Sequence, residues 1–255
     1  MSKPFLVRAV NTAADSENRI HDDRVAAEYG FNGGLVPGVT VYGYMASAVI
    51  EHLGADWLRN GAMDVRFFEP FYEGDPVAVT VEEAVTVEEE ESARWKVEAG
   101  SRASGTAWLS AKPLPSDLLA TPLVSPKPAS RETIQPGVIL GTLEKTLDLS
   151  QPGMAAPLDA YVGEERFAHP AILLALANEV LVRNFALGPW IHASSEVRNS
   201  SAARDGEHLQ VRAKILEAYE RKGHEFVVLD VAILSGERLV SRIRHIAIWQ
   251  PRKIR

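Results

Sequence analysis

The chain has 255 residues and a formal net charge of −7 at pH 7, which is long enough for one large domain or two small ones with a packed core. This acidic balance argues against a general nucleic-acid-binding protein, whose surface is normally basic. The sequence contains no cysteine, which excludes disulfides, thiolate metal sites and cysteine nucleophiles.

The beginning of the chain reads as a strand. Met1–Pro4 leads directly into the strand-like run Phe5–Val10, without the apolar core of a signal peptide. No apolar run reaches the length that spans a bilayer. We therefore expect a cytoplasmic protein that has neither a membrane nor a nucleic acid as its partner.

The first part of the chain then predicts one long helix followed by strands. The helix covers Val39–Leu53, and strands follow over 62–68, 76–87, 91–99 and 103–110. The helix is apolar or small on nearly all sides until Glu51, and a helix of this kind must be enclosed by other elements.

A proline-rich segment divides the chain. Lys112–Pro136 contains six prolines among serines and threonines, a composition typical of a crossing linker. The second part then repeats the order of the first, with an apolar helix over 171–185 and strands over 193–197, 209–216, 225–234 and 238–249. We expect an N-terminal half over 1–111, a linker over 112–137 and a C-terminal half over 138–255. Each half reads as an antiparallel sheet wrapped around a helix, an α+β arrangement.

A polar cluster stands just ahead of the first long helix. Asn18 and His21 are spaced Asn-x-x-His, and the turn Pro37-Gly38 opens the helix. A histidine can carry a proton near neutral pH, and the free N–H groups at a helix N-terminus can bind developing negative charge. Chemistry on an acyl thioester requires this combination.

This stretch resembles the signature of the MaoC-like (R)-specific enoyl-thioester hydratases and dehydratases. That signature runs Asp-x-Asn-Pro-hydrophobic-His, and here the same register reads SENRIH over 16–21. Asn18, Ile20 and His21 match, whereas Ser16 stands at the Asp position and Arg19 at the Pro position. The resemblance implies a hot-dog fold and, with two similar halves, a double hot-dog of two antiparallel sheets that each wrap a central helix.

The resemblance also implies a reaction, the addition of water to an acyl thioester on CoA or acyl carrier protein, or its removal. His21 would carry the proton, Asn18 would orient its neighbours, and the N–H of Gly38 would bind the thioester carbonyl. The carboxylate that the family places at position 16 would have to come from Asp15, Asp22 or Asp23.

Structural roles are open for the same residues. Asn18 can form an Asx turn, His21 and the acidic pair Asp22 and Asp23 can cap the start of a helix, and Gly38 can serve only the turn after Pro37. We expect the substrate site to be lined by residues near the motif and on the two helices, namely Ser16, Val36, Pro37, Tyr42 and Asn178.

The second half lacks the Asn-x-x-His cluster and looks like a degenerate copy that completes a cavity. At its helix start the chain reads Ala-His169-Pro170, and Pro170 has no N–H to offer a ligand. We interpret His169 as a helix cap, and His192 and Asn199 as polar residues on a strand face or an interface.

No metal or organic cofactor is expected. The seven histidines show no metal-binding spacing, and neither a dinucleotide-binding glycine motif nor a Gly-x-Ser-x-Gly elbow is present. The alternatives are a hot-dog thioesterase, which would direct water at the carbonyl, and a non-catalytic protein that binds acyl or other hydrophobic ligands. The expected partner is a small acyl-thioester substrate, and a homodimer is compatible with the sequence.

Overall fold

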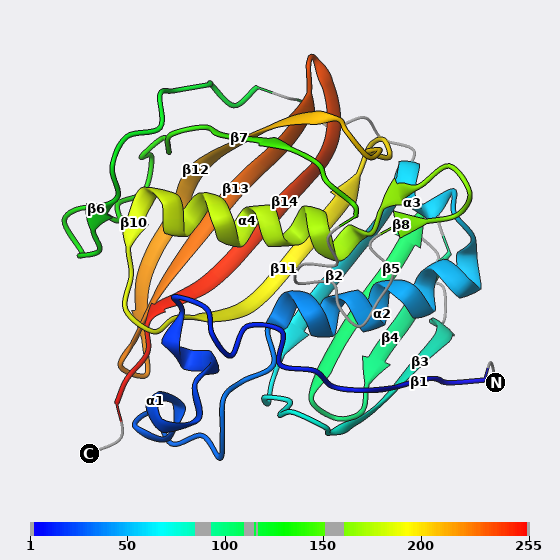
Figure 1. Ribbon diagram of the computed structural model, residues 1–255, viewed down its shortest axis with the longest axis horizontal. Coiled ribbons are helices and arrows are strands. Elements are labelled where there is room, and N and C mark those ends of the chain that lie inside the picture. Colours follow the sequence, from blue (N-terminus) through cyan, green and yellow to red (C-terminus); the bar gives the residue numbers. More distant parts are fainter. Residues whose placement is uncertain (1–2, 85–92, 110–114, 116, 151–160, 254–255) are drawn as a thin grey trace.

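The computed structural model describes residues 3–84, 93–109, 115, 117–150 and 161–253 (Figure 1). Ten strands form one antiparallel sheet in the order β1-β3-β4-β5-β2-β11-β14-β13-β12-β7. The strands from the first part of the chain are β1 Phe5–Arg8, β2 Gly61–Phe67, β3 Pro76–Ala84, β4 Arg94–Ala99 and β5 Ala103–Leu109. Those from the second part are β7 Leu143–Thr146, β11 Ile191–Asn199, β12 His208–Arg221, β13 His224–Ser235 and β14 Arg238–Gln250.

Two long helices lie on one face of this sheet. These are α2, Gly38–Leu53, and α4, Pro170–Asn184, and they contact each other side by side in front of the strands (Figure 1). Shorter helices are α1, Asp23–Ala27, α3, Trp57–Asn60, and a 3₁₀ helix over Arg19–His21. The expected α+β architecture is therefore present.

The two halves of the sheet have matching strand orders. In each half the first strand, β1 or β7, lies at the outer edge, and the strand after the long helix, β2 or β11, lies at the centre. β2 and β11 pair with each other, for example Val65 with Ser195. This pairing joins the two expected sheets edge to edge into one continuous sheet, which corrects the expectation of two separate sheets. As a result, neither β2 nor β11 has an open edge.

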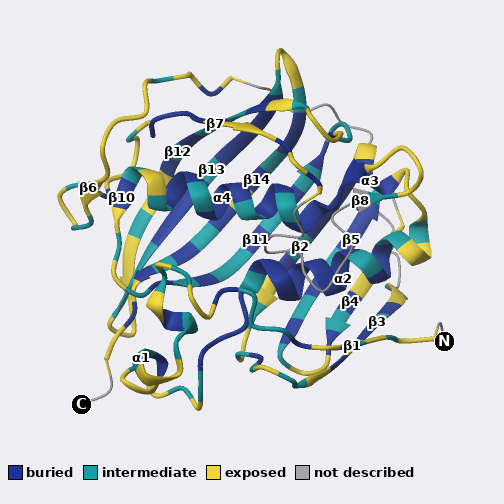
Figure 2. Cartoon of the chain, in the orientation of Figure 1, coloured by how far each residue is buried: buried dark blue, intermediate teal, exposed yellow. Residues whose placement is uncertain are grey.

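The core lies between the sheet and the two helices (Figure 2). Most side chains of α2 are buried, including Tyr42, Met45 and Val49, as the all-round apolar sequence of this helix predicts. Gly61 and Gly105 allow strands and side chains to approach closely, because a Cβ at either position would collide with backbone atoms of Trp57 or Asp64.

The proline-rich segment packs along the second half. Two residues of it, Lys127–Pro128, form β6 beside β10, Phe185–Ala186, which directly follows α4. Leu118 packs against Ala232 and Leu234 of β13. Residues 112–114 and 116 of this segment lie outside the described residues, as do the ends of the strands expected over 76–87 and 103–110 and the start of the one expected over 91–99. Two further short strands, β8 Tyr161–Val162 and β9 Phe167–Ala168, pair with each other.

None of the helices in the described part of the chain combines the length and apolar character needed to cross a membrane.

Candidate functional site

The loop that carries the Asn-x-x-His cluster is fixed by Asn18. Its Oδ1 accepts a hydrogen bond from the backbone N–H of Ile20 and caps the 3₁₀ helix. The same amide reaches across to the second half: Oδ1 accepts from the N–H of Trp190 (3.1 Å), and Nδ2 donates to the carbonyl of Trp190 (3.0 Å). Asn18 therefore joins the motif loop to the segment between α4 and β11.

His21 is held in one tautomer. Its Nδ1 lies 2.6 Å from the carbonyl oxygen of Leu35, and because a carbonyl only accepts, Nδ1 must carry the hydrogen. The lone pair is then on Nε2, which lies 3.3 Å from Nδ2 of Asn18. Burial lowers the pKa of His21, and the bond to Leu35 opposes this effect only in part. The imidazole is therefore neutral near pH 7, with a basic nitrogen available.

Helix α2 begins at Gly38 without a side-chain cap, since its N-cap residue is Pro37. The first N–H groups of a helix have no acceptor within the helix, so this end can bind negative charge. A Cβ on Gly38 would lie 2.8 Å from Nδ1 of His192 and 3.1 Å from Cε2 of Phe67. Only a glycine therefore fits between the helix start and His192.

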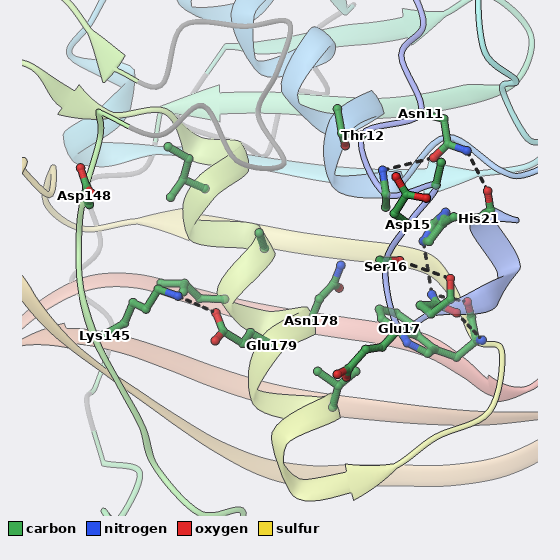
Figure 3. Close-up of a pocket in the computed structure, with 18 of the residues that line it drawn as sticks. Asn11, Thr12, Asp15, Ser16, Glu17, His21, Lys145, Asp148, Asn178 and Glu179 are labelled. Carbon is green, nitrogen blue, oxygen red and sulfur yellow. Dashed lines mark hydrogen bonds and ion pairs between the residues drawn. The ribbon is translucent and has the colours of Figure 1, made fainter.

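Two cavities meet at the motif. The smaller, of about 210 Å³, is lined by Val36, Pro37, Gly38 and His192 among others. The larger, of about 810 Å³, lies between the N-terminal segment, β7 and α4 (Figure 3). Four residues line both cavities, and they mark the boundary between them: Asn18, His21, Asn178 and Trp190.

The larger cavity contains the position at which the family signature has its carboxylate. Ser16 lines it, and its hydroxyl donates to the backbone carbonyl of Asn18 across 3.3 Å. Asp15 also lines this cavity, but it is exposed and makes no hydrogen bond or ion pair with another described residue. No carboxylate of the described chain is hydrogen-bonded to His21, whose side chain bonds only to Leu35 and Asn18.

The two acidic residues after His21 lie outside both cavities. Asp22 caps α1 by accepting from the N–H groups of Arg24 and Val25, and its carboxylate pairs with Arg19 at 2.6 Å. These contacts lower the pKa of Asp22, and the bond from Val25 has the largest effect. Asp23 accepts from the N–H of Gly34 at 2.7 Å. Their expected role as replacement carboxylates is corrected, because both are engaged in holding the loop.

Tyr42 also requires a correction. Its side chain is fully buried in the core and does not line either cavity. Its hydroxyl has no hydrogen-bond partner among the described residues, and burial raises its pKa.

The second half contributes residues that the motif did not reveal. His192 on β11 and His245 on β14 are buried, and Ser195 bridges them, with its hydroxyl 2.8 Å from Nε2 of His192 and 3.0 Å from Nδ1 of His245. His192 packs edge-on against Phe67. These residues lie more than a hundred positions from Gly38 in the sequence, and nothing local to them indicates that they reach the start of α2.

His169 caps α4, as expected, by accepting from the N–H of Ala171. Among the described residues, no three His, Asp or Glu side chains gather closely enough to hold a metal ion.

Comparison with known proteins identifies the fold. No family model and no curated protein matches the sequence. Among solved structures, a MaoC domain protein from Chloroflexus aurantiacus, named as a dehydratase, superposes with a TM-score of 0.66 at 11% identity over 99% of this chain and 96% of its own. A Mycobacterium tuberculosis protein described as having a double hot-dog fold gives 0.56 at 17% identity, over 97% and 96%.

An acyl-CoA thioesterase II from Mycobacterium marinum gives a TM-score of 0.50 at 13% identity, over 84% of this chain and 90% of its own. The chain therefore has the double hot-dog fold, as expected, and shares it with MaoC-like dehydratases and with acyl-thioester hydrolases.

Proposed function

We propose that this protein adds water to an α,β-unsaturated acyl thioester, or removes it from the hydroxylated product, with His21 as the proton carrier. The observation that supports this most directly is the position of His21. Its neutral imidazole lines a cavity that also contains the start of α2 at Gly38. Hydration needs a base for the water and donors for the charge that develops on the carbonyl oxygen.

The reaction proceeds in two steps on these groups. The thioester carbonyl accepts from the N–H of Gly38 at the start of α2, and a water donates to Nε2 of His21 in place of the long contact from Asn18. Nε2 takes the proton as the water oxygen bonds to the β-carbon, and the π electrons move to the carbonyl as an enolate. The imidazolium then returns the proton to the α-carbon, so H and OH are added and His21 is restored.

His21 serves as both base and acid in this scheme because no described carboxylate contacts it. Asn18 orients the imidazole and the water, and its bonds to Trp190 fix its own position. Burial lowers the pKa of His21, and this favours transfer of the proton from the imidazolium to the α-carbon in the second step.

The test is an assay with crotonyl-CoA and longer 2-enoyl-CoAs that follows two signals at once. Loss of the enoyl absorbance without release of free thiol is the expected result. No change in either signal over a range of enoyl chain lengths would contradict the proposal.

A thioesterase is the second candidate. The double hot-dog fold also occurs in an acyl-CoA thioesterase, and a water activated by His21 could attack the carbonyl carbon bound at Gly38. Release of free thiol in the same assay would favour this reaction. Binding without either signal would favour a non-catalytic acyl-binding protein.

A further inference from the structure

Asn178 is a buried polar side chain in an otherwise apolar stretch of α4. It is 8% exposed, and its Oδ1 accepts no hydrogen bond from any described residue. A buried acceptor that is left unpaired costs free energy, because it has lost its hydrogen bonds to water. A donor on a bound molecule would recover that free energy.

The position of Asn178 brings it close to the proposed chemistry. It lines both cavities together with His21, and its side chain points from α4 into the larger one (Figure 3). Oδ1 itself is inaccessible in the free protein. Because the last torsion of an asparagine side chain is soft, the amide can turn and place this oxygen against a donor in the cavity. A group attached a few atoms beyond the reacting carbons would reach it.

The larger cavity is too spacious for a short acyl chain. Its volume is about 810 Å³, at the upper end of the range for small-molecule sites. One face of α4 supplies apolar walls through Ile172, Leu176 and Val182, and the residues just after β7 supply others through Leu147 and Leu149. A ring system or a branched apolar group would bury more surface here than a short linear chain, and burial is the main source of binding free energy.

The charged groups around this cavity are mainly acidic. Among the described residues, Asp15, Glu17, Asp148 and Glu179 line it, whereas Lys145 is the one lysine or arginine and lies 3.4 Å from Glu179. An acyl group that ends in a carboxylate would be repelled. An uncharged group that donates hydrogen bonds would be accepted.

We propose that the acyl part of the substrate is a bulky, uncharged and mainly apolar group that carries a hydroxyl, and that this hydroxyl donates to Oδ1 of Asn178. The inference rests on the acyl-thioester function proposed above and specifies its substrate class. The thioester lies in the smaller cavity at Gly38, the reacting carbons lie at His21, and the bulky group fills the larger cavity.

Binding can be measured without any reaction. The probes are saturated CoA analogues in which a methylene replaces the thioester sulfur, so that they can be neither hydrated nor hydrolysed. They carry a butanoyl group, a 3-cyclohexylpropanoyl group, or the latter with a hydroxyl on ring carbon 2, 3 or 4. Calorimetry should show tighter binding of the ring than of butanoyl, and about tenfold tighter binding again for at least one hydroxylated ring.

Two variants separate recognition from general effects on the fold. Asn178→Leu keeps the shape of the side chain and removes the acceptor. It should abolish the preference for the hydroxyl without lowering the melting temperature, because the acceptor is unpaired in the free protein. Thr146→Val removes a different polar group from the same cavity and should leave the preference unchanged.

Equal affinity for the plain and hydroxylated rings, or an unchanged preference in Asn178→Leu, would overturn the inference. These outcomes are distinct from failure of the proposed reaction. Hydration of enoyl-CoAs without any hydroxyl preference would remove this inference alone. A hydroxyl preference with no hydration of any enoyl thioester would remove the proposed reaction and retain the binding site.

Discussion

At the scale of single residues, His21 provides the most direct test of the proposed reaction. We expect His21→Ala to lower kcat for enoyl-thioester hydration by about 100-fold or more, since general acid–base catalysis contributes a factor of about this size. Asn18→Ala should cost less, because it removes a group that orients the base and not the base itself. Steady-state kinetics of both variants measure the difference.

Circular dichroism and thermal melting are the controls for these two variants. Asn18→Ala also breaks both bonds to Trp190, so its melting temperature should fall further than that of His21→Ala. Full activity in a folded His21→Ala variant would exclude His21 as the proton carrier.

Ser16 tests the missing carboxylate. We expect Ser16→Asp to raise activity on enoyl thioesters, because a carboxylate beside the imidazole would help to hold and activate the water. It would also raise the pKa of His21. The base must be unprotonated, so activity falls with decreasing pH through that pKa. In the wild type this fall should lie below the ordinary histidine value of about 6.5, and Ser16→Asp should move it upward.

Profiles of kcat/KM against pH provide this measurement. Ser16→Asn has nearly the same shape without the charge and is the matched control. If the Asp and Asn variants have the same activity and the same profile, position 16 does not provide the carboxylate of this site.

The sequence predicted the residues of the motif better than it predicted their neighbours. Asn18, His21 and Gly38 line a common cavity, because one short loop and the next helix carry all three. Asp22 and Asp23 could not be separated from catalytic carboxylates by sequence, since the same residue types cap helices. His192 and Trp190 were missed as site residues because the pairing of β2 with β11 brings them in from the other half.

At the scale of elements, the start of α2 depends on the absence of a side chain at Gly38. We expect Gly38→Ala to push the helix start away from His192 and Phe67. The strain should lower stability by about 1–3 kcal/mol and should also reduce kcat/KM, since it displaces the N–H groups that bind the carbonyl.

Urea unfolding and kinetics check both effects. Gly188→Ala is the matched control, because a Cβ there meets no atom within 4 Å, and it should behave like the wild type. Normal kinetics in Gly38→Ala would show that the carbonyl binds elsewhere.

The long elements were predictable because their patterns are strong. Both long helices begin within one residue of the expected position, and the strands after them follow the expected order. The edge strand β7, Leu143–Thr146, was missed. Only one of its four residues is buried, so it shows no alternation of apolar and polar side chains, and it is a strand only because it pairs with β12.

At the scale of the whole molecule, the repeated order of helix and strands predicted a fold with two similar halves. It could not predict how the halves meet. The continuous sheet and the cavities between α4 and the N-terminal segment depend on contacts between distant parts of the chain, such as those of Asn18 with Trp190. Such contacts leave no periodic signal in the sequence.

The pH dependence of stability is a property of the whole fold, because folding buries His169 and His245 in the interior as neutral groups. Burial lowers the pKa of His169 to about 4 and that of His245 to about 3, whereas the unfolded chain has a value of about 6.5. The unfolded state therefore binds more protons in this window, and the free energy of unfolding rises with pH there.

Stability should accordingly be constant above about pH 7.5 and fall below about 6.5, by about 1.4 kcal/mol per pH unit for each histidine. Urea unfolding at pH 7.5, 6 and 5 measures this slope. His169→Asn keeps a good helix cap and removes one titrating group, so it should lessen the slope by about that amount. If His169→Asn has the wild-type slope, protonation of His169 does not contribute to acid unfolding.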